Sequence, residues 1–271
     1  MTHSIIVIPA RYQSSRFPGK PLAMIGEKTL LQRVFEIATA ACRDMPQVEI
    51  VVATDDDRIQ SHAQSLGARV VMTAPECKTG SDRALAACLM MGTAPEIVVN
   101  LQGDAPLTPP HFIRAILTTL INNPDCDVAT PVAQLSWQAL DELRESKAQR
   151  PFSGTTAIID EKDNALWFSK YIIPAMRQEE KLRQQNVLSP VYRHIGLYGY
   201  RFSALQQFVA LPEGHYEALE GLEQLRFLEH GMTIKAVKVD YGMLPSMSGV
   251  DTPEDAKKAE ALLAAAEAYA L

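Results

Sequence analysis

The chain has 271 residues, of which 47% are hydrophobic and 21% charged, and this balance excludes disorder, collagen and a coiled coil as descriptions of the whole. The formal net charge of -6 argues against a nucleic-acid partner, and no apolar run approaches the roughly 20 residues of a membrane span. The chain begins without the pattern of a secretory signal, so we expect a cytoplasmic protein with no membrane partner.

Short apolar runs alternate with stretches of helical periodicity through the first half of the chain. Strands are expected at residues 4–8, 48–53, 69–72, 97–101 and 127–132. Helices are expected at residues 30–41, 56–65, 81–91 (with Ser81 as the cap) and from 109 or 110 to 121. Such alternation predicts an α/β fold, in which a mainly parallel sheet is covered by helices on both faces.

The second half is less regular. Strands are expected at residues 155–160, 165–168 and 195–200, and helices at 217–229 and 252–269. The polar stretch 178–186 is expected to be a mobile loop. No linker divides the chain, so one domain is predicted. The four cysteines show neither a CxxC pair nor zinc-ligand spacing, so reduced thiols are expected at Cys42, Cys77, Cys88 and Cys126.

The loop after the first strand is rich in cations. Residues 9–21 read PARYQSSRFPGKP and place Arg11, Arg16 and Lys20 at the carboxyl end of a strand, where open parallel sheets bind ligands. Two guanidiniums and an ammonium suit a polyanion such as a triphosphate. The loop is neither a P-loop nor a GxGxxG motif. A solvated basic loop is the alternative interpretation.

Two carboxylates stand at positions suited to a metal. Asp104 follows the buried strand 97–101, and Asp251 precedes the last helix. Mg²⁺ favours one or two carboxylates completed by phosphate oxygens and water. A turn before a helix explains Asp104 as well, and a helix start explains Asp251. Gly80, flanked by hydroxyls ahead of a helix, would allow a base or phosphate to approach the backbone closely.

Seven segments in this order carry a family resemblance: IPARYQSSRFPGKPL, TGSDR, NLQGDAPL, ALWFSK, YRHIGLYGY, LEGLEQLRFLEHG and GVDTPEDAKKAE. Together they resemble the 3-deoxy-manno-octulosonate (Kdo) cytidylyltransferases. The resemblance implies a Rossmann-like three-layer α/β/α nucleotidyltransferase fold with a smaller dimerisation elaboration, and therefore a homodimer. It also implies Mg²⁺-dependent transfer of CMP from CTP to a 3-deoxy-2-keto sugar acid for cell-surface polysaccharide synthesis, such as that of lipopolysaccharide. Within the single domain 1–271, residues 1–133 would bind the nucleotide, and residues 134–271 the sugar and a second subunit.

The same resemblance implies roles for individual residues. The triphosphate would be bound by Ala10, Arg11, Ser14, Arg16 and Lys20. The cytosine and ribose would be surrounded by Gly80, Ser81, Asp82 and Arg83, and Gln102 would contact the nucleotide or the sugar acid. Mg²⁺ would be held by Asp104 and Asp251, which with Arg11 and Lys20 form the catalytic set. The sugar pocket would be lined by Lys170, His194, Tyr198, Glu223 and Gln224.

Three positions depart from the family pattern, all relevant to the sugar or the metal. Thr156 stands where members carry Lys, Lys170 where they carry Arg, and Ala105 where they carry an acidic residue. The substrate is therefore left open between Kdo and a modified octulosonate such as 8-amino-Kdo. A sugar-1-phosphate nucleotidyltransferase would need a glycine-rich loop that residues 10–16 lack. A catalytically silent nucleotide-binding homologue is the remaining alternative, although it would have no chemical need for two metal carboxylates.

Overall fold

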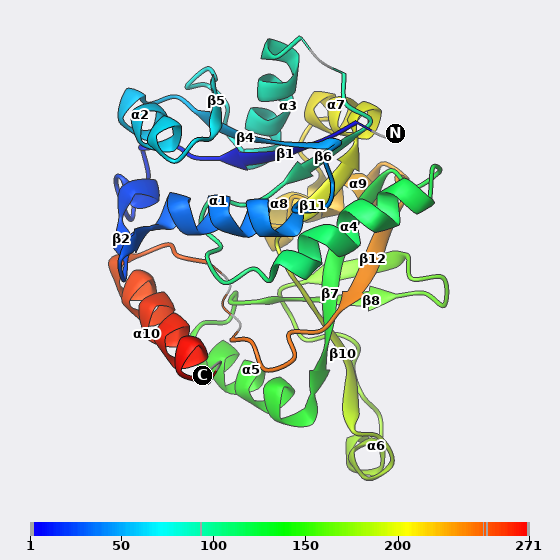
Figure 1. Cartoon of the computed structure of the whole chain (residues 1–271). Helices are drawn as coiled ribbons and strands as arrows, with labels where there is room; N and C mark the ends of the chain where they lie inside the picture. The colour runs from blue at the N-terminus through cyan, green and yellow to red at the C-terminus, as the bar shows by residue number, and fades with distance from the viewer. Residues whose placement is uncertain (1–2, 93, 246, 248, 270–271) are drawn as a thin grey trace.

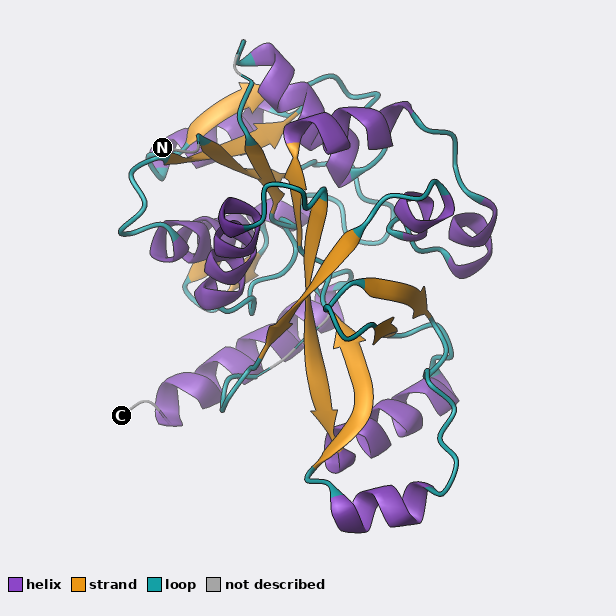
Figure 2. Ribbon diagram, turned by 90° about the vertical axis from the view of Figure 1, so that its right-hand side faces the viewer, coloured by secondary structure: helices purple, strands orange, loops and turns teal. Residues whose placement is uncertain are grey.

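The computed structural model describes residues 3–92, 94–245, 247 and 249–269, and these form a ten-stranded mixed sheet with helices on both faces (Figures 1 and 2). The strands are β1 (Ser4–Pro9), β2 (Met24–Ile25), β3 (Lys28–Thr29), β4 (Val48–Thr54), β5 (Arg69–Met72), β6 (Ile97–Asn100), β7 (Val128–Ser136), β8 (Thr155–Ile159), β9 (Ala165–Ser169), β10 (Leu188–His194), β11 (Tyr198–Arg201) and β12 (Ile234–Val239). The helices are η1 (Lys20–Leu22), α1 (Leu30–Ala41), α2 (Asp57–Ser65), α3 (Gly80–Met90), α4 (Pro110–Asn122), α5 (Trp137–Gln149), α6 (Glu179–Gln185), α7 (Phe202–Ala210), α8 (His215–Glu220), α9 (Leu225–Glu229) and α10 (Pro253–Tyr269).

The strand order along the sheet is β5-β4-β1-β6-β11-β7-β10-β8-β9, and β12 also pairs with β7. The strands β5, β4, β1 and β6 are parallel, as is the β7–β12 pair. The strands β11, β10, β8 and β9 pair antiparallel with their neighbours. The predicted α/β/α architecture is confirmed, and its parallel core lies in the first half of the chain.

The strand β1 shows how the sequence fills the two layers. Ile6 and Ile8 face a core that α1, α4 and the start of α10 complete, whereas Ile5 and Val7 face a second core with α3, α7 and α9. All four side chains are fully buried. Because neighbouring residues of a strand point to opposite faces, an unbroken apolar run is required where helices cover both sides.

The strands and helices predicted for the first half are confirmed within a few residues, except for the cap of α3. We expected Ser81 in that role, but the cap is Thr79, whose hydroxyl accepts from the backbone of Asp82 at 3.1 Å. The Asp82 carboxylate in turn accepts from the Thr79 amide at 2.9 Å. This reciprocal capping box satisfies two donors that the helix would otherwise leave unpaired, so the chain enters the helix two residues earlier.

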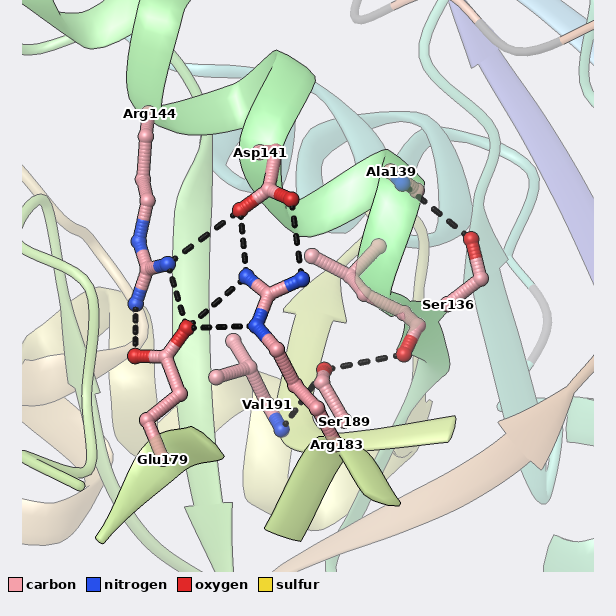
Figure 3. A network of polar contacts seen from close by, with 9 residues as sticks. Ser136, Ala139, Asp141, Arg144, Glu179, Arg183, Ser189 and Val191 are labelled. Carbon is pink, nitrogen blue, oxygen red and sulfur yellow. Dashed lines mark hydrogen bonds and ion pairs between the residues drawn. The ribbon is translucent and has the colours of Figure 1, made fainter. Parts of the chain in front are cut away.

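The prediction of a mobile loop over 178–186 is wrong, because this stretch contains α6. The network in Figure 3 ties α6 to α5: Arg144 donates two hydrogen bonds of 2.7 Å to Glu179, and Arg183 contacts both Glu179 and Asp141. The Arg183 guanidinium also lies 4.6 Å from the centre of the Trp137 ring. The polar composition of α6 thus reflects ion pairing with a neighbouring helix.

Other elements of the second half also differ from expectation. The helix expected at 217–229 is two helices, α8 and α9, because Gly221 takes a left-handed conformation (φ 63°) that ends the first. The strand expected at 195–200 is β11, and β10 precedes it. Besides α6, four elements of the second half were not predicted, namely α5, β10, α7 and β12, and neither were the short η1, β2 and β3 of the first half. The hairpin of β8 and β9 and the helix α10 are confirmed.

Two further expectations concern the cysteines and the membrane. All four cysteines are free thiols, and burial raises the pKa of Cys42 to about 11 and that of Cys88 to about 12. Within the described ranges, no helix combines the length and the apolar character needed to cross a membrane.

Candidate active site

An open cleft of about 1040 Å³ lies at the carboxyl ends of β1 and β6. Its walls come from the loop after β1, the start of α3, the turn after β6 and the segment before α10. Ten of the predicted site residues line it: Ala10, Arg11, Ser14, Arg16, Lys20, Gly80, Arg83, Gln102, Asp104 and Asp251. The sheet therefore gathers into one cleft residues that are up to 241 positions apart in the sequence (Ala10 to Asp251).

The cationic loop of residues 10–21 has a defined conformation. Its first residue, Ala10, donates its amide to the Ala53 carbonyl on β4 at 2.9 Å. Gly19, in the left-handed region with φ 71°, closes the loop by donating to the Tyr12 carbonyl at 2.9 Å. The Arg58 guanidinium stacks 3.3 Å above the Tyr12 ring. These contacts order the loop, whereas the sequence alone left open that it is a solvated surface loop without defined contacts.

The two candidate metal carboxylates converge on one ammonium group. Lys20 Nζ lies 2.8 Å from Asp104 Oδ2 and 3.4 Å from Asp251 Oδ1, and Arg16 Nη2 lies 3.1 Å from the latter oxygen. The backbone amide of Val250 donates to the Asp104 carbonyl at 2.8 Å, and this bond brings Asp251 to the turn after β6. Gly103 permits the same turn, because a side-chain carbon there would overlap the Pro9 carbonyl oxygen.

This donor set fits a hard divalent cation that a phosphate helps to bind. The carboxylates of Asp104 and Asp251 contact the same ammonium group, so both face the position where a cation would bind. No cluster of three or more His, Cys, Asp or Glu suited to a metal occurs in the part of the chain that the structure describes. Two carboxylates completed by nucleotide oxygens and water are the arrangement that Mg²⁺ prefers.

The start of α3 separates the four residues predicted around the cytosine and ribose. A side-chain carbon at Gly80 would lie 3.2 Å from Asn100 Nδ2 and 3.4 Å from the Gln102 amide, so the backbone of α3 packs closely on the end of β6. Gly80 and Arg83 line the cleft, but Arg83 is nearly buried and its guanidinium pairs with Asp55 at 2.9 Å. Asp82 belongs to the capping box described above.

Ser81 points instead into a second, buried polar cluster. Its hydroxyl donates to Glu223 at 2.6 Å, and the Tyr198 hydroxyl donates to Gln224 at 3.0 Å. Burial raises the pKa of Glu223. The amide of Asn100 and the Gln224 Nε2 atom are buried and have no hydrogen-bond partner among the residues that the structure describes. Since buried polar groups normally pair, these atoms are suited to bind a polar ligand.

His194, at the end of β10, belongs to the same region. The Thr130 hydroxyl donates to the Leu197 carbonyl at 2.9 Å, so its 2.8 Å contact with His194 Nε2 is best assigned as a hydrogen bond from the ring, which leaves Nδ1 as an acceptor. Burial, and then the charge of Lys170, lower the pKa of His194 to about 3. The ring is therefore neutral at physiological pH.

Several residues beside these sites were missed by sequence reasoning. Asn100 and Thr130 are fully buried polar residues in apolar strands, and such a polar interruption is a usable signal for Asn100. Arg58 and Lys78 also line the cleft. Arg58 lies in the first turn of α2, just after the carboxyl end of β4. The predicted site loops likewise follow the carboxyl ends of parallel strands.

The architecture and the cation-carboxylate cleft together define a nucleotidyltransferase-type site, and comparisons with known proteins agree. A family model described as "Cytidylyltransferase" matches residues 5–234. A 3-deoxy-manno-octulosonate cytidylyltransferase of Maricaulis maris is 44% identical over 96% of this chain and 97% of its own. An 8-amino-3,8-dideoxy-manno-octulosonate cytidylyltransferase of Shewanella piezotolerans is 42% identical over 96% of this chain and 98% of its own.

A solved structure extends the agreement to three dimensions. A CMP:2-keto-3-deoxy-manno-octonic acid synthetase complexed with CTP superposes with a TM-score of 0.81 at 35% identity, covering 97% of this chain and 99% of that one. The chain belongs to the cytidylyltransferase family, in the branch of the 3-deoxy-manno-octulosonate cytidylyltransferases. It is accordingly a nucleotidyltransferase, as the sequence predicts.

Proposed function

We propose that this chain transfers CMP from CTP to the anomeric hydroxyl of Kdo and releases pyrophosphate. The observation that carries the proposal is the convergence of Lys20, Asp104 and Asp251 beside the cationic loop in one cleft. The relatives named above supply the identity of the nucleotide and the sugar acid. The cleft supplies the charge pattern that such a reaction requires.

In this reaction the sugar hydroxyl attacks the α-phosphorus in line and pyrophosphate leaves, so catalysis requires orientation and charge neutralisation. Arg11, Arg16 and Lys20 would bind the triphosphate and stabilise the charge that develops on pyrophosphate. Mg²⁺ would be held by Asp104 and Asp251 and, when bound, would supply Lewis-acid polarisation of a phosphate oxygen. For Lys20 this role means exchanging its two carboxylate partners for phosphate oxygens.

The remaining members of the predicted nucleotide set would act around the base and ribose. Ala10 and Ser14 would support the triphosphate from the loop, and Gly80 would let the nucleotide approach the backbone of α3. Ser81, Asp82 and Arg83 would shape this part of the site through the contacts already described. Gln102, beside Gly80, would lie between the nucleotide and the sugar acid.

The buried cluster next to this cleft would bind the sugar acid. Lys170 would pair with its carboxylate, and the neutral His194 ring would accept a hydrogen bond from a sugar hydroxyl. Tyr198, Glu223 and Gln224 would contact further hydroxyls, and the partnerless amide atoms of Gln224 and Asn100 support this assignment. Residues 1–133 would thus bind the nucleotide and residues 134–271 the sugar.

Cellular context is part of the same proposal. Four free thiols support a reducing compartment, so we infer a cytoplasmic enzyme that supplies an activated sugar for cell-surface polysaccharide such as lipopolysaccharide. We also infer a homodimer formed by the second half. Large exposed apolar side chains there, including Phe152, Tyr171 and Val187, support an interface.

A second candidate substrate is 8-amino-Kdo, favoured by the relative from Shewanella piezotolerans and by Lys170 at an Arg position. The deciding experiment measures pyrophosphate release from CTP and Mg²⁺ with Kdo, 8-amino-Kdo, sialic acid and sugar-1-phosphates, with products identified by mass. Turnover with Kdo is expected. Turnover with 8-amino-Kdo alone would replace the substrate, and CTP binding without any turnover would favour a silent homologue.

A further inference from the structure

The backbone that carries Lys170 is fixed by polar contacts on both sides. Glu220 accepts from the Ser169 hydroxyl at 2.8 Å and from the Lys170 amide at 2.7 Å. The same Ser169 hydroxyl accepts from the Tyr171 amide at 2.9 Å. The pKa of Lys170 is lowered, because burial of its ammonium group outweighs the opposite effect of the nearby Glu220 carboxylate. The main chain at Lys170 is therefore well anchored.

Thr156 adds a second anchor through its side-chain hydroxyl. It is fully buried on β8, opposite Ser169 of β9. Its hydroxyl donates to the Tyr171 carbonyl at 2.7 Å and accepts from the Ile173 amide at 3.1 Å. A hydroxyl can donate and accept at once, whereas an ammonium only donates. Thr156 thus closes the turn that follows Lys170.

Lys147 of α5 provides the third anchor. Its ammonium donates to the carbonyls of Ser153 and Gly154 at 2.5 and 3.0 Å and to that of Lys170 at 2.5 Å. These three bonds use all its hydrogens, so Lys147 holds the backbone and leaves Lys170 to meet a ligand. The ammonium group of Lys147 is half-buried and lies close to Lys170. Burial, and then the charges of Lys170 and Arg193, lower the pKa of Lys147.

We propose that Thr156 and Lys147 are positioning residues for the sugar acid: they hold residues 169–173 so that the Lys170 ammonium meets the carboxylate of the substrate beside His194. The proposal rests on the proposed function, because it needs a sugar acid as the ligand. Lys147 of α5 places a positive charge next to Lys170, and Thr156 shapes the turn that follows Lys170.

The test is the steady-state kinetics of Thr156→Val, Thr156→Ser and Lys147→Met with the keto-sugar acid that wild type uses best. Thr156→Val keeps the shape but removes the hydroxyl, and it should raise the KM for the sugar acid about tenfold or more while the KM for CTP stays within about twofold. Thr156→Ser should restore most of the loss. Lys147→Met should act as Thr156→Val does, and Lys181→Met, at an exposed position on α6, should not.

Thermal unfolding of each variant identifies loss of folding, and Thr156→Ser keeps the test decisive if Thr156→Val is unstable. An unchanged KM for the sugar acid in folded Thr156→Val, or an equal rise in both KM values, would overturn the proposal. So would a serine variant as impaired as the valine one. Absence of wild-type turnover with every keto-sugar acid would instead overturn the proposed function, and the two failures are therefore distinct.

Discussion

At the scale of single residues, Lys20 is the most informative side chain of the cleft. Its side chain is only 15% exposed, yet it pairs with two carboxylates that would otherwise repel one another. The positive charge of this ammonium offsets the repulsion between the two carboxylates. Bound CTP would add further negative charge to the cleft. Lys20 and a divalent cation would both help to neutralise it.

The first prediction concerns Asp104. Asp104→Asn keeps the size of the side chain but removes one of the two charges proposed to hold Mg²⁺, so turnover should fall about 100-fold or more. The fold should persist, because the carboxylate is 33% exposed and its ion pair contributes little to stability. Pyrophosphate release and circular dichroism measure the two properties. Activity close to that of wild type would remove Asp104 from the metal site.

The second prediction concerns Gly103. A methyl group there would overlap the Pro9 carbonyl oxygen, so Gly103→Ala should push the turn after β6 away from β1 and displace Asp104. We expect a loss of about 1–3 kcal/mol in unfolding free energy together with a lower kcat. Gly196→Ala is the matched control, since a side-chain carbon at Gly196 would meet no atom of the described residues within 4 Å. Urea unfolding of both variants checks the difference, and equal stability would contradict the overlap.

At the scale of elements, features that depend on neighbouring residues could be predicted from the sequence, whereas features that depend on distant contacts could not. Lys20 and Asp104 could be predicted because each belongs to a short motif beside an apolar strand, and the rule for parallel sheets places such strand ends together. The contact of Thr130 could not, since it depends on which strand pairs with which. Thr130 reaches His194 only because β7 pairs with β10 in the observed register.

The helix α6 illustrates a different limit. A stretch with few apolar residues gives no hydrophobic periodicity, so it was expected to be a loop. The structure stabilises it through Arg144, Arg183 and Asp141, which contact Glu179 or one another across two helices. Such pairing depends on the spatial position of α5, which the local sequence does not encode.

The third prediction tests that network. Hydrogen bonds from Arg144 and then Arg183 lower the pKa of Glu179 to about 2, so its charged form is favoured in the folded state. Glu179→Gln should speed hydrogen exchange of residues 179–185 at neutral pH. The free energy of global unfolding should change by less than about 1 kcal/mol, because these ion pairs are partly exposed. In wild type the same local loosening should appear as the pH falls from 4.5 toward 2. Unchanged exchange in the variant would show that α6 does not depend on this carboxylate.

At the scale of the whole molecule, β7 joins the two halves of the site. It pairs with β11 and β10 and also with β12, so the proposed nucleotide and sugar regions share one sheet. Thr130 of β7 contacts His194 at 2.8 Å, and β11, which pairs with both β6 and β7, carries Tyr200, whose hydroxyl lies 3.3 Å from that of Ser81. A sugar acid and a nucleotide bound to the two regions would therefore be held in a fixed relation, as an in-line transfer requires.

The buried His194 links this arrangement to global stability through pH. Its pKa is about 3 in the folded state, below the ordinary value of 6.5, so between these values the unfolded chain binds the proton that the folded chain excludes. This contribution to stability is fully present above pH 6.5 and is lost as the pH falls, by about 2 kcal/mol at pH 5. Urea unfolding of wild type and His194→Gln at pH 7 and pH 5 measures it. The variant should lose about 2 kcal/mol less than wild type over this interval, whereas His111→Gln, at an exposed position, should behave as wild type does. An identical loss in wild type and His194→Gln would mean that this ring takes up a proton in the folded protein near pH 5, and that burial does not lower its pKa as described.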